Sequence, residues 1–321
     1  MPKVSVIIPV YGVEKCIERC ARSLFEQTLD DIEYIFVDDC TPDKSIEILE
    51  SIIEEYQLRF VEEKKVVRIV RMPTNSGQVA VRRHGIQLAT GEYIAHCDSD
   101  DWVDVDAYRL LYENAISHNA DIVACDYYIT NGHTTKAKSN HYKCNPEEFL
   151  KDLIAIRNTW SLWNKLVRRN IYTDNPITYP LDNMGEDMAL VFQLAYYSKK
   201  ISVIERPLYF YFQNTESITH IIDKNFAYKR FRQAINNTNL VLGFFKECGL
   251  LTKYKKELVC YKQFERNQCI MLIDDPKIRR EWLSVFPELN IEVLFSPYFT
   301  FKYKIKYILA ALGLRTKNVS L

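Results

Sequence analysis

The sequence predicts an α/β fold, in which helices flank a mostly parallel β-sheet and a helical region follows it. Short β-branched runs alternate with stretches of helical periodicity over roughly the first hundred residues, as in right-handed strand–helix–strand units. Acidic residues stand where several of those runs end. Residues 224–290 keep a helical pattern with few turn signals. The 321 residues suffice for one large domain or two modest ones.

The N-terminal elements are expected in alternating order. VSVIIPV at 4–10 is a continuous apolar run, typical of a strand buried on both faces. Apolar residues then recur at helical spacing from Val13 to Leu24, which predicts a helix that ends near Gln27. Further strands are expected at 33–39, 66–72 and 92–98, separated by helices over 45–56 and 75–90 and followed by a helix that begins near Tyr108.

Composition argues against several classes of protein. Lys plus Arg and Asp plus Glu each total 42, so no bulk charge attracts nucleic acid or another polyanion. Nine cysteines are scattered without a CxxC pair, which argues against a zinc site and a disulfide framework. The N-terminal apolar run lacks the features of a signal peptide, and no run of about 18 apolar residues predicts a membrane-spanning helix. A cytoplasmic protein is expected.

Acidic residues and one aromatic residue are expected along one edge of the sheet. In such sheets, ligands bind outside the carboxyl ends of the strands. The first predicted strand runs into Val10 and Tyr11, the second into Asp38 and Asp39, and the fourth into HCDSDD at 96–101. Carboxylates without a His or Cys cluster suit Mg²⁺ or Mn²⁺, and a divalent ion would offset the repulsion among the aspartates.

The same aspartates also allow a structural interpretation. Asp residues after strands form turns and cap helices, and Asp101 or Asp104 could cap the helix expected near Tyr108. The ordered set of acids at several strand ends favours the ligand-binding interpretation.

Three segments resemble the GT-A family 2 glycosyltransferases, nucleotide-sugar-dependent inverting enzymes that are common in bacterial polysaccharide assembly. The segments read VSVIIPVYGVEKCIERCARSLFEQT, YIFVDDCTPDKSIEI and NSGQVAVRRHGIQLATGEYIAHCDSDDWV. The resemblance implies a Rossmann-like GT-A domain at 1–222, with a nucleotide-binding part at 1–125 and an acceptor-binding part at 126–222. A helical region at 223–321 would follow.

The resemblance implies that residues at the ends of the first two predicted strands bind the donor. Pro9, Val10 and Tyr11 would line the base pocket, with Glu14 near the ribose. Asp39, the second acid of VDD, would contact the base. The chain departs from the usual family pattern at Cys40, Val81 and Arg83, which leaves the donor preference open.

Donor and metal contacts are also implied on the other side of the nucleotide. Gly77 and Arg82 match the family's NxGxxxAR segment, which lies beside the nucleotide and its diphosphate. In the DxD motif, Asp98 would lie near the ribose and Ser99 would belong to the donor site. Asp100 would be the main ligand of Mn²⁺ or Mg²⁺.

Inverting transfer also needs a base on the acceptor side, because the acceptor hydroxyl must lose its proton as it attacks. The segment NMGEDMALVFQLAYYSKK offers Glu186 and Asp187 at the start of an apolar-periodic helix. The resemblance makes Asp187 the base and lets Glu186 orient the acceptor. The alternative is that the two acids only complement the helix dipole.

Further acceptor or diphosphate contacts are expected from two other segments. In NTWSLWNKL, Trp163 could face a sugar ring and Lys165 a phosphate, although a Trp pair at this spacing also suits core packing. Phe212 stands where family members often have Arg. His220 could approach the metal or diphosphate, or could be an ordinary solvent-facing His.

The last segment, 296–321, is basic and amphipathic. It contains five Lys or Arg residues and no acid, while Ile305, Ile308, Leu309 and Leu312 share one helical face. This pattern is typical of a helix that binds a membrane surface, but also of a helix that packs its apolar face on the domain.

Together with these features, the resemblance implies a metal-dependent inverting glycosyltransferase. It would use a nucleotide sugar, which in proteins of this family is most often UDP-linked, and a saccharide or lipid-linked acceptor in bacterial polysaccharide or lipopolysaccharide synthesis. Two alternatives remain. A nucleotidyltransferase would want a Gly-rich, Lys-bearing phosphate loop, for which PVYGVEKC is a poor match. A non-catalytic nucleotide-binding scaffold would not need the aspartates at 39, 98, 100 and 187.

Overall fold

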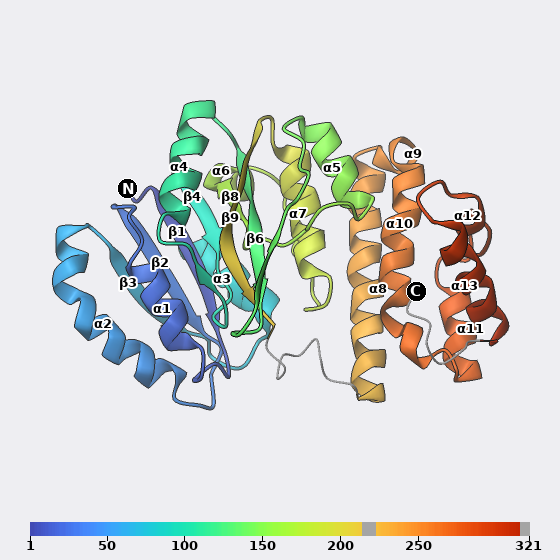
Figure 1. The fold of residues 1–321 in the computed structure, drawn as a ribbon, viewed down its shortest axis with the longest axis horizontal. Helices are drawn as coiled ribbons and strands as arrows, with labels where there is room; N and C mark the ends of the chain where they lie inside the picture. Colours follow the sequence, from blue (N-terminus) through green and yellow to red (C-terminus); the bar gives the residue numbers. More distant parts are fainter. Residues whose placement is uncertain (214–222, 315–321) are drawn as a thin grey trace.

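The computed structural model describes residues 1–213 and 223–314. A central β-sheet with helices on both faces forms one part of the molecule, and a helical layer forms the other (Figure 1). The strands are β1 (Val4–Val10), β2 (Ile32–Asp38), β3 (Val66–Arg71), β4 (Tyr93–His96), β5 (Trp102–Val103), β6 (Ile122–Thr130), β7 (Thr135–Lys138), β8 (Lys165–Arg168) and β9 (Ile201–Phe212).

The helices alternate with strands at first and then follow one another. The helices of the sheet region are α1 (Ile17–Phe25), α2 (Ser45–Glu62), α3 (Gln78–Leu88), α4 (Ala107–His118), α5 (Pro146–Ile154), α6 (Arg169–Thr173) and α7 (Glu186–Tyr197). The C-terminal helices are α8 (Lys224–Glu247), α9 (Leu250–Lys253), α10 (Lys255–Arg266), the 3₁₀ helix η2 (Asn267–Leu272), α11 (Pro276–Ser284), α12 (Leu289–Phe295) and α13 (Phe301–Leu312). Among the helices described, none is long and apolar enough to cross a bilayer.

The strand order confirms the predicted parallel core and extends it with a mixed region. Strands run in the order β3-β2-β1-β4-β8-β6-β9-β5, and β7 pairs with β6. The first four are parallel neighbours, as the alternating sequence pattern predicts. Beyond them, β8 pairs antiparallel with both β4 and β6, while β6 and β9 are parallel. The predicted division at residue 125 falls inside β6, so the sheet is continuous across it.

Alternating side chains of β1 fill two cores on opposite faces of the sheet. Val4, Val6 and Ile8 pack with residues of α1, α2 and α4. Ile7 points to the other face, where it packs in a core with residues of α3, α5, α7 and α8. Because both faces are covered, the strand reads as a continuous apolar run rather than an alternating one.

The long helix α8 belongs to two cores. Val241, Phe244 and Phe245 pack in the core shared with α7. Phe231 and Ile235, nearer its start, pack in a third core formed by the C-terminal helices. The C-terminal layer is therefore attached to the sheet through a shared helix.

A buried acid lies where the C-terminal layer meets the start of α7. Glu265 on α10 is 1% exposed, and its Oε2 has no hydrogen-bond partner. A Cβ added to Gly185 would lie 3.3 Å from its other oxygen. Burial raises the pKa of Glu265 to about 8 from 4.5.

We expect Glu265→Gln to stabilise the protein in a pH-dependent way. Between the two pKa values the unfolded chain releases this proton and the folded protein keeps it, so wild-type stability falls as pH rises through that window. The glutamine removes this cost, giving a gain of about 2–4 kcal/mol near pH 7.5 that vanishes near pH 4.5. Urea unfolding at both pH values measures it, with exposed Glu50→Gln as control. An equal gain at both pH values would contradict the burial argument.

Candidate active site

The loop after β1 is held by the polar turn after β2. The backbone amide of Gly12 donates to Thr41 Oγ1 at 2.8 Å, and that of Glu14 donates to Asp43 Oδ2 at 2.9 Å. Val13 donates similarly to Ser45 Oγ at 3.1 Å. The sequence indicated only a turn here, so these anchoring side chains were not anticipated.

The predicted base-pocket residues differ in their exposure. Tyr11 is 50% exposed and Glu14 is also exposed, so both are accessible at the carboxyl edge of the sheet. Pro9 is half-buried, and Val10 lies within the core. The side chain of Val10 is therefore not accessible to a ligand, and only its backbone could make a contact there.

Asp39 joins the end of β2 to the start of α3. Its Oδ1 accepts from the Ser76 amide at 2.7 Å and its Oδ2 from the Gly77 amide at 2.9 Å. Gly77 has a φ of 80°, and an added Cβ would lie 2.8 Å from the Asn183 side chain. The carboxylate and the glycine thus shape one loop at the sheet edge.

Arg82 is the centre of a buried charge cluster. The side chain is 1% exposed. Its Nη2 lies 2.6 Å from Asp98 Oδ1, and its Nη1 lies 2.6 Å from Asp187 Oδ1 and 3.2 Å from Glu186 Oε1. One guanidinium therefore bridges the acidic segment after β4 to the acidic pair that opens α7. The structure brings these four predicted residues together.

Burial and the neighbouring charges shift the pKa values of the residues in this cluster. Burial would lower the pKa of Arg82, but the carboxylates of Glu186, Asp187 and Asp98 outweigh it and raise that pKa. Burial raises the pKa of Glu186 well above its ordinary value, and its Oε2 has no hydrogen-bond partner. Burial therefore favours the neutral form of Glu186, and Arg82 opposes that shift. Burial also raises the pKa of Asp98, although Arg82 opposes the shift.

The remaining acids of HCDSDD have different surroundings. Burial, followed by the charge of Asp98, raises the pKa of Asp100 to about 6. Asp101 accepts from the Tyr209 hydroxyl and from the Phe212 amide, each at 2.7 Å. Ser99 is buried. Asp101 is therefore structural, but it does not cap a helix as one interpretation proposed, because it is bonded to β9.

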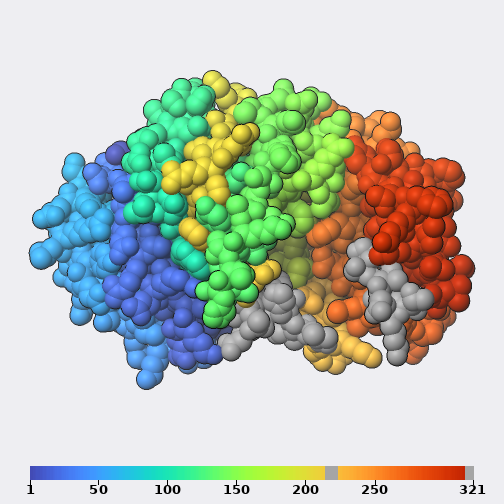
Figure 2. All heavy atoms as spheres, viewed as in Figure 1, coloured from blue at the N-terminus to red at the C-terminus, as the bar shows by residue number. Residues whose placement is uncertain are grey.

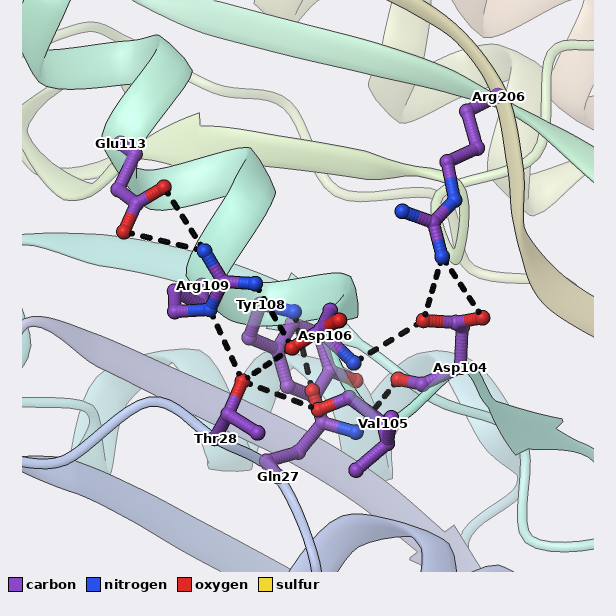
Figure 3. A network of polar contacts seen from close by, with 9 residues as sticks. All are labelled: Gln27, Thr28, Asp104, Val105, Asp106, Tyr108, Arg109, Glu113 and Arg206. Atoms are coloured by element: carbon purple, nitrogen blue, oxygen red, sulfur yellow. Dashed lines mark hydrogen bonds and ion pairs between the residues drawn. The ribbon is translucent and has the colours of Figure 1, made fainter.

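The segment after these acids is fixed to the loop that follows α1 (Figure 3). Gln27 Nε2 donates to the Asp104 carbonyl at 2.7 Å, and its Oε1 accepts from the Tyr108 amide at 3.0 Å. Thr28 Oγ1 donates to Asp106 Oδ1 at 2.7 Å. The N-cap position of α4 belongs to Asp106, so the expectation that Asp101 or Asp104 caps this helix is wrong.

Arg19 on α1 is a cation at this edge that sequence reasoning missed. Its guanidinium carbon lies 3.7 Å from the Trp102 ring centroid and 4.4 Å from that of Phe212. Its Nη2 donates to the Asp100 carbonyl at 3.0 Å. Phe212, which replaces the Arg frequent in the family, thus packs against an Arg from another element. No local signal in the α1 sequence indicates this contact.

Trp163 and Lys165, which were predicted to contact a sugar ring and a phosphate, instead have side chains that point into the protein. Trp163 is 9% exposed and stacks on Tyr209 with ring centroids 4.4 Å apart. Lys165 is 2% exposed, and its Nζ donates to the carbonyls of Thr159 and Ser161 at 3.0 and 2.7 Å. The structure therefore favours core packing for both residues. The predicted site residue His220 lies outside the described residues.

The acids at this edge suit a divalent ion that is held partly by substrate. The described residues include no group of three or more His, Cys, Asp or Glu side chains placed to hold a metal. Asp100 and the partly exposed Asp98 supply hard carboxylate oxygens. Mg²⁺ is typically held by one or two carboxylates together with substrate phosphates, so this donor set fits such an ion.

Comparison with known proteins decides the family. Residues 5–179, more than half of the chain, match the family model described as Glycosyl transferase family 2. The chain belongs to this family. This glycosyltransferase is 31% identical over 281 residues to the Bacillus subtilis strain 168 protein named Uncharacterized glycosyltransferase EpsJ, covering 85% of this chain and 78% of that protein. It is 31% identical over 232 residues to Poly(ribitol-phosphate) beta-glucosyltransferase of Bacillus spizizenii, covering 70% and 35%.

Solved structures share the fold of this glycosyltransferase. S. aureus TarS 1–349 in complex with UDP-GlcNAc superimposes with a TM-score of 0.65 at 19% identity, covering 97% of this chain and 88% of that chain. The mannosyltransferase PcManGT of Pyrobaculum calidifontis, in complex with GDP-Man and Mn²⁺, gives a TM-score of 0.55 at 14% identity, covering 97% and 86%. The family 2 enzyme therefore has the GT-A fold, with a helical C-terminal region.

Proposed function

We propose that this glycosyltransferase transfers a sugar, with inversion, from a UDP-sugar to a saccharide or lipid-linked acceptor in bacterial surface polysaccharide or lipopolysaccharide synthesis. The observation that carries the proposal is the Arg82 bridge, which joins the donor-side Asp98 to the acceptor-side Asp187. UDP-GlcNAc bound to TarS supports the choice of nucleotide. The reaction would take place in the cytoplasm, at the inner face of the membrane if the acceptor is lipid-linked.

In the proposed single displacement, Asp187 accepts the proton of the acceptor hydroxyl as that oxygen attacks the anomeric carbon. The bond to the nucleoside diphosphate breaks on the opposite face of the sugar. Arg82 holds one oxygen of Asp187, and the other lies 3.4 Å from the Leu162 amide. The side chain is 23% exposed, so it can reach an acceptor. Glu186 Oε1 lies 3.2 Å from the same Arg82 nitrogen, so it helps to fix the guanidinium that holds Asp187.

The donor side is proposed to use the sheet edge. Tyr11, Glu14 and the loop shaped by Asp39 and Gly77 would hold the nucleoside. Asp100, with Asp98 near the ribose, would hold Mn²⁺ or Mg²⁺. When bound, such an ion offsets the negative charge of the leaving diphosphate. The Mn²⁺ in the PcManGT complex supports the use of a divalent metal.

A screen of nucleotide sugars for hydrolysis, with and without Mn²⁺, tests the proposed donor. We expect slow, Mn²⁺-dependent release of UDP from at least one UDP-sugar. If folded protein releases no nucleotide from any sugar donor under these conditions, the proposed reaction is wrong.

We expect Asp100→Asn to remove the metal-dependent stabilisation by nucleotide. At about 100 times its Kd, UDP with Mn²⁺ should stabilise the wild-type protein by about 2.7 kcal/mol, which corresponds to a rise in Tm of roughly 3–6 °C. The variant keeps the shape of the side chain but loses the charge of the ligand, so most of this rise should be lost. Differential scanning fluorimetry measures it. Exposed Asp30→Asn is the control, and a full Tm rise in the Asp100 variant would exclude Asp100 as the main ligand.

A further inference from the structure

The helix α13 presents an apolar stripe to solvent. Phe301 is 79% exposed, Ile305 43%, Ile308 42% and Leu312 65%. These positions follow the spacing i, i+4, i+7 and i+11, so the four side chains lie along one line of the helix. Figure 2 shows the C-terminal helices at the end of the molecule opposite α2.

The opposite face of α13 attaches the helix to the protein. Tyr307 and Ala310 are each 2% exposed and belong to the C-terminal core. The Tyr307 hydroxyl accepts from Arg266 Nη2 at 2.9 Å, and its ring centroid lies 5.4 Å from that of Trp282. The helix is therefore fixed by a face other than the stripe. The expectation that the apolar stripe itself packs on the domain is wrong.

Basic side chains border the stripe on both sides. At about 100° per residue, Lys302 falls on one side of the line and Lys304 falls on the other. Residues 296–321 contain no Asp or Glu, so the Lys and Arg residues of this segment give it a positive charge. A line of exposed apolar side chains between lysines is complementary to a lipid bilayer, which has an apolar interior, when its headgroups are negatively charged.

We infer that α13 lies in the surface of an anionic lipid bilayer, with Phe301, Ile305, Ile308 and Leu312 inserted between the headgroups and the lysines on lipid phosphates. Interfacial helices combine this geometry and charge. A second copy of the chain fits less well, because a two-fold pairing of the stripes would place lysines opposite lysines. The inference rests on α13 alone and does not depend on the proposed donor or base.

Vesicle sedimentation of the full chain tests this inference. The probes are vesicles of mixed phosphatidylglycerol and phosphatidylcholine, and vesicles of phosphatidylcholine alone. The test variant carries Phe301→Ser, Ile308→Ser and Leu312→Ser, all at exposed positions. The matched control carries Leu58→Ser and Val61→Ser on α2, where the side chains are 84% and 81% exposed at the other end of the molecule.

We expect the wild-type protein and the control to bind the anionic vesicles at least tenfold more strongly than the neutral ones. The triple variant should lose at least tenfold in partitioning, and Lys302→Glu should weaken binding most at low ionic strength. No binding of the wild-type protein to anionic vesicles, or an equal loss in the control, would overturn the inference. So would sedimentation showing that the stripe mediates self-association. The UDP and Mn²⁺ thermal shift of the same samples reports separately on the donor site.

Discussion

Replacing Asp187 with Asn should lower kcat for sugar transfer by about 10³-fold, because loss of a general base typically costs 10²–10⁴-fold. The amide cannot take the proton from the acceptor hydroxyl, but it can still accept a hydrogen bond from Arg82, so the cluster should remain folded. Steady-state kinetics with a saturating donor measures the effect. The UDP and Mn²⁺ thermal shift should persist in this variant, since the donor side is not altered.

Glu186→Gln provides a matched comparison on the neighbouring residue. Burial raises the pKa of Glu186 well above its ordinary value, which favours the neutral carboxyl, and glutamine is a neutral side chain of the same shape. We expect this variant to lose less than about tenfold in kcat, well below the loss at Asp187. Similar losses at both positions would show that the pair acts as a structural unit and that Asp187 is not the specific base.

Replacing Arg82 with Leu should destabilise the protein by about 3–5 kcal/mol, the usual cost of removing one partner from a buried ion pair. Three acids, Asp98, Glu186 and Asp187, would lose the cation they share. Urea unfolding near neutral pH measures the loss. Because the uncompensated carboxylates can take up protons, we expect the deficit to shrink as pH falls toward about 5.

The next residue in the chain supplies the control for Arg82. Arg83 is exposed on the same helix, and its guanidinium lies 5.2 Å from the Tyr179 ring centroid. We expect Arg83→Leu to change the free energy of unfolding by less than about 1 kcal/mol. An equal, pH-independent loss at both positions would mean that helix α3 itself, rather than the charge cluster, is sensitive to substitution.

Local sequence pattern was sufficient for the N-terminal strands and for the edge that holds the acids. β1 to β4 are short runs rich in apolar residues, and their parallel pairing in the order β3-β2-β1-β4 places their carboxyl ends at one edge. The mixed region was not predicted, because β8 has four residues and reaches β4 from more than sixty positions away. Short segments carry too little periodicity to fix such a pairing.

In the candidate site, too, the local sequence pattern did not predict contacts between residues far apart in the chain. Strand ends and family motifs pointed to Arg82, Asp98, Asp100 and Asp187. They did not indicate that Arg82 joins two of these acids, since Arg82 and Asp187 are 105 residues apart. Spacing alone could not tell a Trp or Lys on the surface from one in the core, and Trp163 and Lys165 are buried. In α13 the spacing revealed the stripe, but only the packing of Tyr307 showed which way it faces.

The membership of α8 in two cores has a practical consequence for exchanging parts between relatives. The sheet-facing half of this helix supplies Val241, Phe244 and Phe245 to the core that supports α7 and hence the start of that helix at Glu186 and Asp187. A chimaera joined just before Lys224 would replace half of that support along with the C-terminal layer. Recombination between family members should therefore transfer α7 and α8 as one block, so that the helix bearing the base keeps the surface it packs on.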